Sequence, residues 1–355
     1  MSEILEKIRG MNQLEKIIFF DLLFESKSSN LTIILNCVDE KTREAFYKEL
    51  PDHITTLLKI ETTETTPPKA EIRLAEKEIL TIFDKVHEKT AEAKKYQKKH
   101  TKMIKESRKI MKSTDDTDFY WISDQGRGIE TPPPQKEYDS TAEIIDLPPP
   151  DTLVLKNPNI LDCIRDRKSR RTFTDEYLTM EELSYLLWAT QGVRKVFPGR
   201  RGSFRTVPSG GARNPFETYV AVQRVKNIKK GVYRYLPFEH KLLYLFSDEK
   251  MPETLTRLAW GQSFVGKSAV CFIWSTIPYR TEWRYGLKAK KDILQESGHI
   301  CQNLYLACES ILCGTCAVGA YDQEGLDHFL RLDGEEEFVI YLAPVGRVKS
   351  EKNTK

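Results

Sequence analysis

Apolar positions along the chain repeat with two periods, and these divide it into segments of different structure. Spacings of three and four residues predict helices, and short β-branched runs predict strands. Ile4–Leu22 has the helical spacing, whereas Leu31–Cys37 and Leu57–Thr63 are short apolar runs typical of strands. With a polar helix over Glu40–Leu50 and another after a proline pair, the pattern predicts a small accessory α/β module over residues 1–84, whose role it leaves open.

Residues 85–150 are expected to form a basic helical linker, over 85–112, and then a proline-rich strap, over 114–150. Eleven Lys or Arg against three Glu lie in 85–112 at helical spacing. This run fits either a basic arm for nucleic acid or an acidic partner, or a solvated linker. Only Tyr96 could stack on a base, so the linker is favoured and no nucleic-acid partner is expected. The triplets Pro132–Pro134 and Pro148–Pro150 predict extended chain.

From residue 151 the pattern becomes regular. Asn159 can cap one helix, and Thr179 with Glu182 forms a capping box ahead of another. Hairpins mixed with long helices favour an α+β layer fold over a repeating βαβ array. The predicted strands are Glu217–Val225, Val232–Tyr235, Lys241–Leu245, Ala269–Thr276 and Phe338–Val345. A long helix is predicted over Lys288–Leu312.

Composition limits the class of protein. The 355 residues are 40% hydrophobic and 30% charged with a net charge of +3, as in soluble globular proteins. No apolar run reaches the length of a membrane span. The first residues include acids where a signal peptide carries bases, so a cytoplasmic location is expected, with the seven cysteines as reduced thiols.

Three segments carry candidate chemistry. In Arg167–Arg171 alternate side chains of an extended segment project to one side, and Arg and Ser are donors suited to a phosphate. In Pro208–Pro215 two glycines permit close approach of backbone to a flat ring. Gly314–Tyr321 is a small-residue strand after a helix. The first two have ordinary alternatives, namely a basic helix end at the surface and a tight loop before a strand.

Together these segments resemble the nitroreductase superfamily of FMN-dependent oxidoreductases, and more closely its SagB-type branch, which includes azoline dehydrogenases of peptide biosynthesis. The resemblance rests on Arg167–Phe173, Pro208–Glu217, Gly298–Leu304 and Gly314–Ala320, and covers about residues 105–348. It implies a nitroreductase-like fold with a mostly antiparallel central sheet flanked by helices, in a homodimer with FMN at the interface between subunits. NADH or NADPH is the implied electron donor.

The resemblance also implies roles for individual residues. The residues implied to hold the FMN phosphate are Arg167, Lys168, Ser169 and Arg171, with Arg347 as a later cation nearby. Those implied to line the flavin ring are Pro208, Ser209, Gly210 and Gly211, with Arg213 as a following donor, while Gly319 and Ala320 place a backbone amide near flavin N5.

One departure concerns the substrate. Azoline dehydrogenases have a Lys-Tyr pair ahead of the central helix, and the nearest match here is Arg284–Tyr285. Arginine cannot act as a base near neutral pH, so nitro or quinone reduction is favoured over azoline oxidation. Tyr285 and Arg284 are the candidate catalytic residues. A further alternative is a flavin-fold binding or sensor protein that uses its basic N-terminal segment.

The cysteines admit a second interpretation. Cys313 and Cys316 form a C-x-x-C motif, and Cys301 and Cys308 share a helical face just before it. A single such motif is a weak metal signal and cysteine packs as a small hydrophobe, so no metal is expected. His299 is interpreted as a buried core histidine. The catalytic domain is predicted over 151–348, with a disordered tail over 349–355.

Overall fold

The computed structural model describes residues 2–26, 29–48, 50, 54–55, 58–59, 67–112, 123–150 and 154–349. The chain divides into two compact units, Met1–Lys109 and Ile110–Lys355. The boundary predicted after residue 84 falls inside one continuous helix of the first unit. The predicted tail lies outside the described residues except for Lys349.

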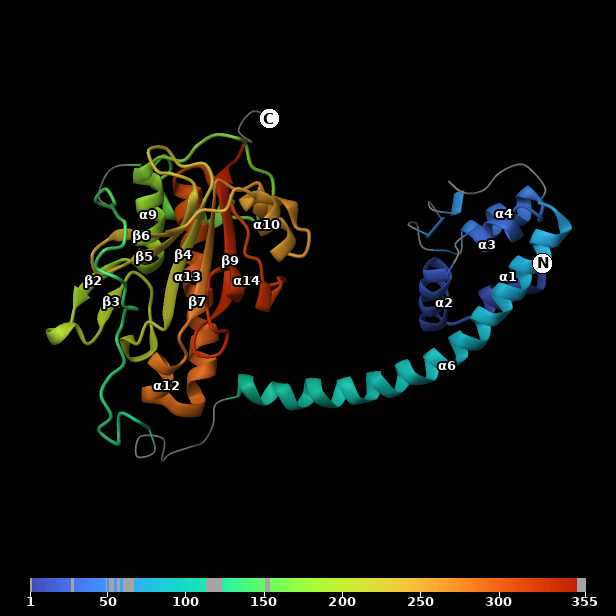
Figure 1. The fold of residues 1–355 in the computed structure, drawn as a ribbon, viewed down its shortest axis with the longest axis horizontal. Coiled ribbons are helices and arrows are strands. Elements are labelled where there is room, and N and C mark those ends of the chain that lie inside the picture. The colour runs from blue at the N-terminus through green and yellow to red at the C-terminus, as the bar shows by residue number, and fades with distance from the viewer. Residues whose placement is uncertain are drawn as a thin grey trace. The chain divides into compact units, whose positions relative to one another are not determined.

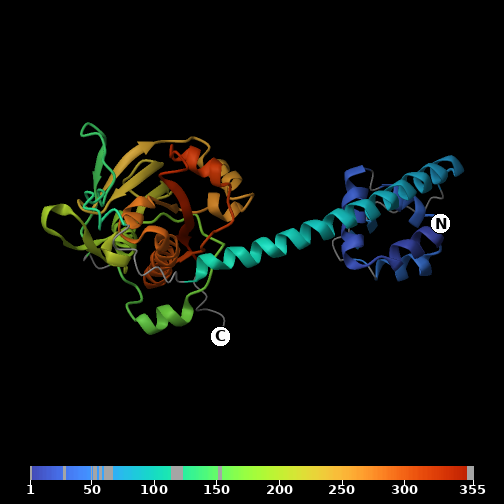
Figure 2. The ribbon, with the colours of Figure 1, turned by 90° about the horizontal axis from the view of Figure 1, so that it is seen from below.

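The described part of the first unit is helical. Its elements are α1 (Ser2–Gly10), α2 (Gln13–Ser26), α3 (Ser29–Leu35), α4 (Glu40–Tyr47), α6 (Lys69–Ser107) and the 3₁₀ turn η1 (Arg108–Met111). The first half of α6 packs against α2 and α3, as Figure 2 shows. In its second half, residues 94–107 are exposed on all sides, as expected of a solvated helix.

The strand predicted over Leu31–Cys37 is wrong, because this run forms α3 and the turn after it. Leu31, Ile34 and Leu35 are fully buried. They stand at positions i, i+3 and i+4, which lie on one face of a helix. A short apolar run fits a strand and a buried helix equally well until its neighbours are known. Of the second predicted strand, Leu58 and Lys59 are helical and the rest lies outside the described residues.

A seven-stranded sheet organises the second unit (Figure 1). Its strand order is β1-β6-β5-β4-β7-β9-β8, and every neighbouring pair is antiparallel. The strands are β1 (Ile144–Asp146), β4 (Phe216–Val222), β5 (Gly231–Leu236), β6 (Lys241–Phe246), β7 (Val270–Thr276), β8 (Cys313–Thr315) and β9 (Phe338–Arg347). The predicted hairpin and the predicted buried strands are therefore confirmed.

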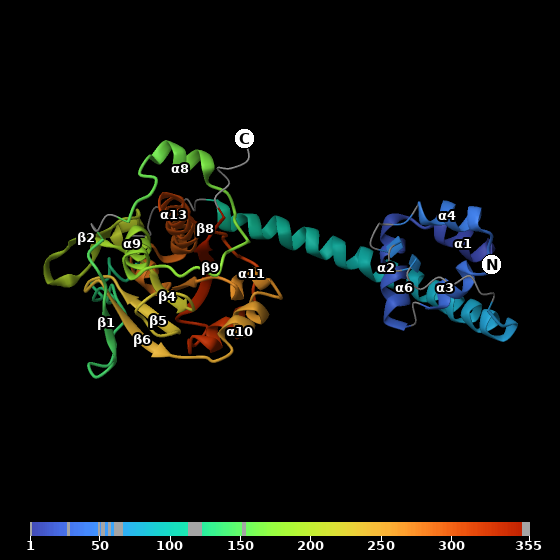
Figure 3. The same ribbon diagram turned by 90° about the horizontal axis from the view of Figure 1, so that it is seen from above.

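Helices cover both faces of this sheet (Figure 3). Val220 and Phe272 point to the face covered by α9 (Met180–Gln191) and α13 (Ala289–Ser310). Their neighbours Ala221 and Cys271 point to the other face, which α10, α11 and α14 cover. The layered α+β architecture that the sequence predicts is thus confirmed.

The remaining elements are α8 (Ile160–Asp166), β2 (Val193–Val196), η2 (Pro198–Arg200), β3 (Ser203–Arg205), η3 (Gly210–Ala212), α10 (Met251–Leu258), α11 (Ser263–Gly266), α12 (Tyr279–Tyr285), η4 (Gly286–Lys288) and α14 (Gln323–Phe329).

The helix caps read from the sequence are present. The Asn159 side chain accepts a hydrogen bond from the backbone N–H of Leu161 at the start of α8. Thr179 and Glu182 form both bonds of the capping box at the start of α9. None of the described helices combines the length and apolar content that a membrane crossing requires.

The proline-rich strap is held on the sheet by buried charges. Glu217, on the central strand β4, accepts hydrogen bonds from the backbone N–H of Lys136 at 2.9 Å and from Arg280 at 2.6 Å. Arg234 donates to the carbonyl oxygens of Lys136 and Glu137. Burial raises the pKa of Glu217, but Arg280 and Arg234 outweigh burial and leave it below its ordinary value. The strap is therefore fixed by groups that are already charged at neutral pH.

Replacing Glu217 by alanine should destabilise the protein strongly, because the buried Arg280 and the Lys136 N–H lose their partner. We expect the free energy of unfolding to fall by about 3–5 kcal/mol, measured by chemical denaturation. Asp162→Ala, which breaks the exposed ion pair with Arg165, is the control and should cost less than about 1 kcal/mol. Similar losses in the two variants would contradict this role of Glu217.

Candidate active site

The predicted phosphate segment lies beside the sheet edge. Ser169 forms a parallel bridge with Thr315 of β8, and the Arg170 N–H donates to the Thr315 carbonyl oxygen at 2.9 Å. The segment is therefore extended, as the alternation of its side chains requires. The first and third predicted segments, which are nearly 150 residues apart in the sequence, are therefore in contact.

Tyr305 of α13 connects these two segments. The sequence analysis did not identify this residue. Its hydroxyl lies 2.9 Å from Ser169 Oγ and accepts a hydrogen bond from the Ala317 N–H at 2.8 Å. The Arg167 guanidinium carbon lies 5.2 Å from the centre of the Tyr305 ring. The only signal in the sequence was its position directly after the central-helix motif, which does not show where the hydroxyl points.

The cations of this region fall into two groups. Arg170 pairs with Glu309 at 3.2 Å, and Arg347 pairs with Glu182 and also donates to the Ile311 carbonyl oxygen at 2.8 Å. By contrast, Arg167 and Arg171 have no carboxylate partner among the described residues, and Arg171 lies only over an aromatic ring. Their charge remains available to an anion.

A cavity of about 780 Å³ lies next to this segment. Arg167, Lys168 and Arg347 are among its lining residues, so the structure brings these three predicted cations together. Ser169 and Arg171 are not among them. Arg347 is therefore near the predicted site, but its guanidinium is already bound to Glu182.

Gly319 and Ala320 follow β8 along the edge of β9. Val318 is paired with Leu342, and the Ala320 carbonyl oxygen accepts a hydrogen bond from Gln262 at 2.9 Å. Both Gly319 and Ala320 are exposed. Within the described part of the chain their backbone N–H groups have no hydrogen-bond partner, so they could donate to a bound ligand.

The second predicted segment forms η3 and meets the predicted catalytic pair. Gly211 has φ of +55°, where residues with a side chain are strained. A Cβ there would lie 2.8 Å from both Arg284 Cδ and Tyr285 Oη. Arg284 and Tyr285 from α12 therefore lie directly against the loop that the sequence assigned to the flavin ring.

The polar groups of this loop point to Glu296 of α13, which the sequence analysis also missed. The Gly210 N–H donates to Glu296 Oε1 at 2.6 Å, and the Ser209 hydroxyl lowers the pKa of this carboxyl. Burial raises the pKa of Glu296 to about 7 against these effects. Nothing in the sequence distinguished Glu296 from other acids on a long helix.

Arg213 connects the loop with the strap and α12. Its guanidinium donates to Thr131 Oγ1 at 2.8 Å and to the Gly211 carbonyl oxygen at 3.2 Å. It also lies 5.2 Å from the centre of the Trp283 ring, and the Trp283 indole N–H donates to the Ile129 carbonyl oxygen. Arg213 is thus held on three sides at the edge of the loop.

The structure therefore forms two groups of candidate residues along one helix. One group surrounds Tyr305 and the other surrounds Glu296, which lies nine residues earlier on α13, roughly 13 Å along the helix axis. Pro208, Ser209, Gly210 and Gly211 belong to the Glu296 group with Arg284 and Tyr285.

Comparison with known proteins identifies the family of the chain. The model of the nitroreductase family matches residues 164–347, which span both groups. The chain belongs to the nitroreductase family. A Methanocaldococcus jannaschii protein that carries the name nitroreductase is 34% identical over 202 residues, 56% of this chain and 98% of that protein.

Solved structures of nitroreductases resemble the second unit. A Ralstonia eutropha nitroreductase has a TM-score of 0.49 at 26% identity and covers 61% of this chain and 95% of its own. The E. coli microcin synthetase McbBCD complex with truncated pro-MccB17 bound has a TM-score of 0.44 at 21% identity, covering 61% of this chain and 79% of that chain.

The four cysteines in α13 and in or directly after β8 lie close to the Tyr305 group, and Cys313 lines its cavity. Cys301, Cys308, Cys313 and Cys316 are buried free thiols, and burial raises the pKa of Cys313 to about 12. The described residues contain no group of three or more His, Cys, Asp or Glu placed to hold a metal ion. The prediction of a buried His299 is wrong for this chain, since the residue is exposed on the outer face of α13.

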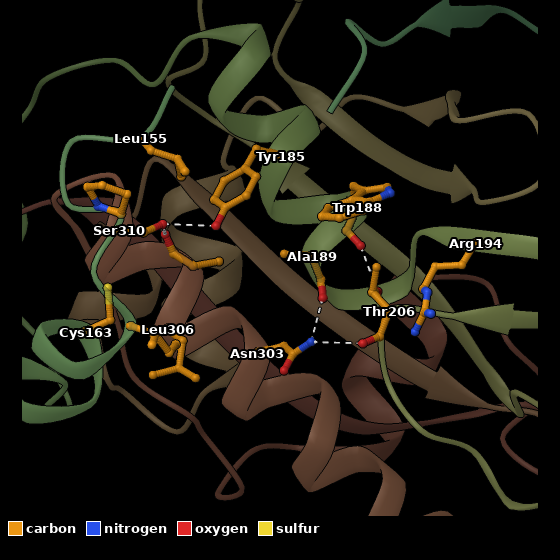
Figure 4. Close-up of a pocket in the computed structure, with 13 residues that line it drawn as sticks. Leu155, Cys163, Tyr185, Trp188, Ala189, Arg194, Thr206, Asn303, Leu306 and Ser310 are labelled. Atoms are coloured by element: carbon orange, nitrogen blue, oxygen red, sulfur yellow. Dashed lines mark hydrogen bonds between the residues drawn. The ribbon is translucent and has the colours of Figure 1, made fainter. Parts of the chain in front are cut away.

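A separate pocket of about 460 Å³ lies between α8, α9 and α13 (Figure 4). Its polar groups mostly bind one another: Tyr185 bonds to Ser310, and Asn303 donates to the carbonyl oxygens of Ala189 and Thr206. Few polar groups among the described lining residues are therefore free to bind a ligand in this pocket.

Gly211→Ala should destabilise the protein, because the new methyl group collides with Arg284 and Tyr285 at a positive φ. We expect a loss of about 1–3 kcal/mol in the free energy of unfolding, measured by chemical denaturation. Gly210→Ala is the matched control, since its nearest neighbour would lie at an ordinary 3.4 Å. Equal stability of the two variants would show that the loop does not pack against α12 as described.

Proposed function

We propose that this protein is an FMN-dependent oxidoreductase that acts as a homodimer and uses NADH or NADPH as the electron donor. The observation that carries the proposal is that Arg167 and Arg171, in the extended segment that also holds Ser169, have no carboxylate partner among the described residues. They lie in the part of the chain that the nitroreductase family model matches.

The phosphate of FMN fits this group chemically. Guanidinium groups and a hydroxyl donate the charge-assisted hydrogen bonds that phosphate oxygens accept best. Tyr305 orients Ser169, and its ring supports the Arg167 guanidinium. In this proposal Lys168 adds charge at the cavity, while Arg347 acts mainly through Glu182.

In this proposal the flavin ring lies against two backbone segments. One is the loop of Gly210 and Gly211, against which Arg284 and Tyr285 pack on one side. The other holds the N–H groups of Gly319 and Ala320, which have no partner among the described residues and are donors suited to flavin N5. When bound, FMN supplies hydride transfer at N5. The chain supplies the phosphate grip, the orientation of the ring and the cation Arg213 at the edge of the loop.

A homodimer accounts for the separation of the two groups. Leu294 on the outer face of α13 and Ile160, Leu161 and Ile164 on α8 are large apolar side chains that are more than half exposed. Such a surface is typical of a protein interface. In a dimer, the Glu296 group of one subunit can face the Tyr305 group of the other, which completes the site.

For the substrate we favour nitro or quinone compounds over azolines. Arg284 is the nearest match to the lysine of azoline dehydrogenases, and an arginine cannot serve as a base near neutral pH. Its guanidinium lies 5.5 Å from the centre of the Tyr285 ring, a contact suited to holding a charge in place. In the proposed reaction Tyr285 donates or accepts a proton, and Arg284 binds an anionic or aromatic substrate.

Arg171→Ala tests the phosphate grip. Removing one charge-assisted contact should raise the dissociation constant for FMN by about tenfold to a hundredfold. Riboflavin, which lacks the phosphate, is the matched ligand and should bind the variant as it binds the wild type. Fluorescence titration measures both. Equal losses for FMN and riboflavin would place Arg171 away from the phosphate.

Anaerobic addition of NADH and then NADPH to the purified protein tests the electron donor. The absorbance of bound flavin should be present and should bleach with one of the two. A yellow protein that neither donor bleaches would instead support a dehydrogenase reduced by its own substrate, which is the azoline alternative. A protein that binds no flavin would contradict the proposed function.

For residues 85–112 we propose a solvated linker and not a binding arm. Lysines surround the exposed half of α6, while the aromatic contact there is the stacking of Tyr96 on His100, 5.7 Å between ring centres. We expect no salt-dependent binding of the full chain to DNA or RNA in fluorescence anisotropy. Strong binding that weakens with salt would instead favour a sensor or binding role.

A further inference from the structure

Glu296 holds the flavin-facing loop from the side of α13. Its side chain is buried, and its carboxyl accepts the Gly210 N–H at 2.6 Å. The Ser209 hydroxyl lowers the pKa of this carboxyl, and Ser209 Oγ accepts the Asn214 N–H at 2.8 Å. The peptide between Ser209 and Gly210 is thus held by one carboxyl group.

The opposite end of the loop is fixed independently. Asn214 donates to the carbonyl oxygens of Ser203 and Ala212, at 2.9 and 3.1 Å. This attachment contains no titratable group. The position of Ser209 and Gly210 therefore depends on Glu296, whereas the return of the chain into β4 does not.

We propose that Glu296 is a positioning residue for the flavin ring, and that the charge on its carboxyl sets how firmly Ser209 and Gly210 are held against it. This inference rests on the proposed function, because it takes the loop as one wall of the flavin site. Glu296 acts through the loop and does not itself need to touch the ring.

The surroundings of Glu296 make its charge variable near neutral pH. Burial raises its pKa to about 7, the Gly210 and Ser209 hydrogen bonds oppose burial, Asp292 one turn earlier on α13 raises the pKa further, and Arg205 from β3 lowers it. Tyr285 from α12 also faces the loop at this point. The carboxyl therefore changes its charge in the range in which the protein would work.

The charged form should hold the loop more firmly. A buried carboxylate that loses its donors is costly, and its hydrogen bonds are roughly twice as strong as those of a neutral acid. The protonated form imposes no such demand. Flavin binding by the wild type should therefore gain from the ionisation of Glu296 as the pH rises through about 7.

The test is the dissociation constant for FMN of the wild type and of Glu296→Gln from about pH 5.5 to about pH 8.5. The ratio of the two constants cancels the titration of the FMN phosphate itself. We expect the variant to bind about fivefold more weakly relative to the wild type at the upper end than at the lower end.

Asp292→Asn is the matched control on the same helix. It removes a neighbouring negative charge, so Glu296 should ionise at lower pH, and the step in FMN affinity should remain but move to lower pH. A merely structural role of Glu296 would not produce such a movement. A ratio for Glu296→Gln that stays constant with pH overturns the proposal.

The unfolding transition of the flavin-free protein checks the variants. Because the folded-state pKa of Glu296 is raised above its usual value, its contribution to stability is present at low pH and is lost as pH rises toward about 7. Glu296→Gln should therefore lose less stability than the wild type over this interval. If this variant does not fold, Asp292→Asn decides alone, and a pH dependence of FMN affinity that matches that of the wild type overturns the proposal.

These outcomes separate the two proposals. A wild type that binds no FMN at any pH contradicts the proposed function and this role of Glu296 together. A wild type that binds FMN while the ratio stays flat contradicts the role of Glu296 alone.

Discussion

The packing of α13 against the central sheet is the constraint on which both groups of candidate residues depend. Ile300, Leu304 and Ala307 bury one face of the helix against the strands, which leaves its axial position and rotation little freedom. Tyr305 and Glu296 then point to fixed places along the same helix. Tyr305 and Glu296 each orient a different backbone segment. The geometry of the candidate site therefore depends on how α13 packs against the sheet.

Buried charge fixes the strap around this framework. Lys136 of the strap donates to Glu217 through its backbone N–H and to Glu337 through its side-chain ammonium group. Arg280 of α12 also donates to Glu217, and Tyr219 of β4 also donates to Glu337. The strap continues to Thr131 and Ile129, which contact Arg213 and Trp283. A segment that looks like a simple linker in the sequence therefore packs beside the loop of Ser209–Ala212.

The regular elements of the second unit could be predicted because their signals are local. The capping box of Thr179 and the alternation along β4 and β7 depend only on neighbouring residues. Leu31–Cys37 was misassigned because its β-branched residues favour a strand, while the burial that selects a helix comes from α6, far along the chain. His299 was misplaced because helical spacing does not show which face is covered.

The sequence by itself determined the family, the order of the elements and the three segments that carry the candidate chemistry, since residue types and spacings are sufficient for those. Only the tertiary structure decided which polar groups are already satisfied. Arg347 is bound to Glu182 while Arg171 is not, and Glu296 rather than a ring receives the donors of the loop. Hydrogen bonds and burial depend on residues distant in sequence, so the protonation of Glu296 and the free charge of Arg171 exist only once the chain has folded.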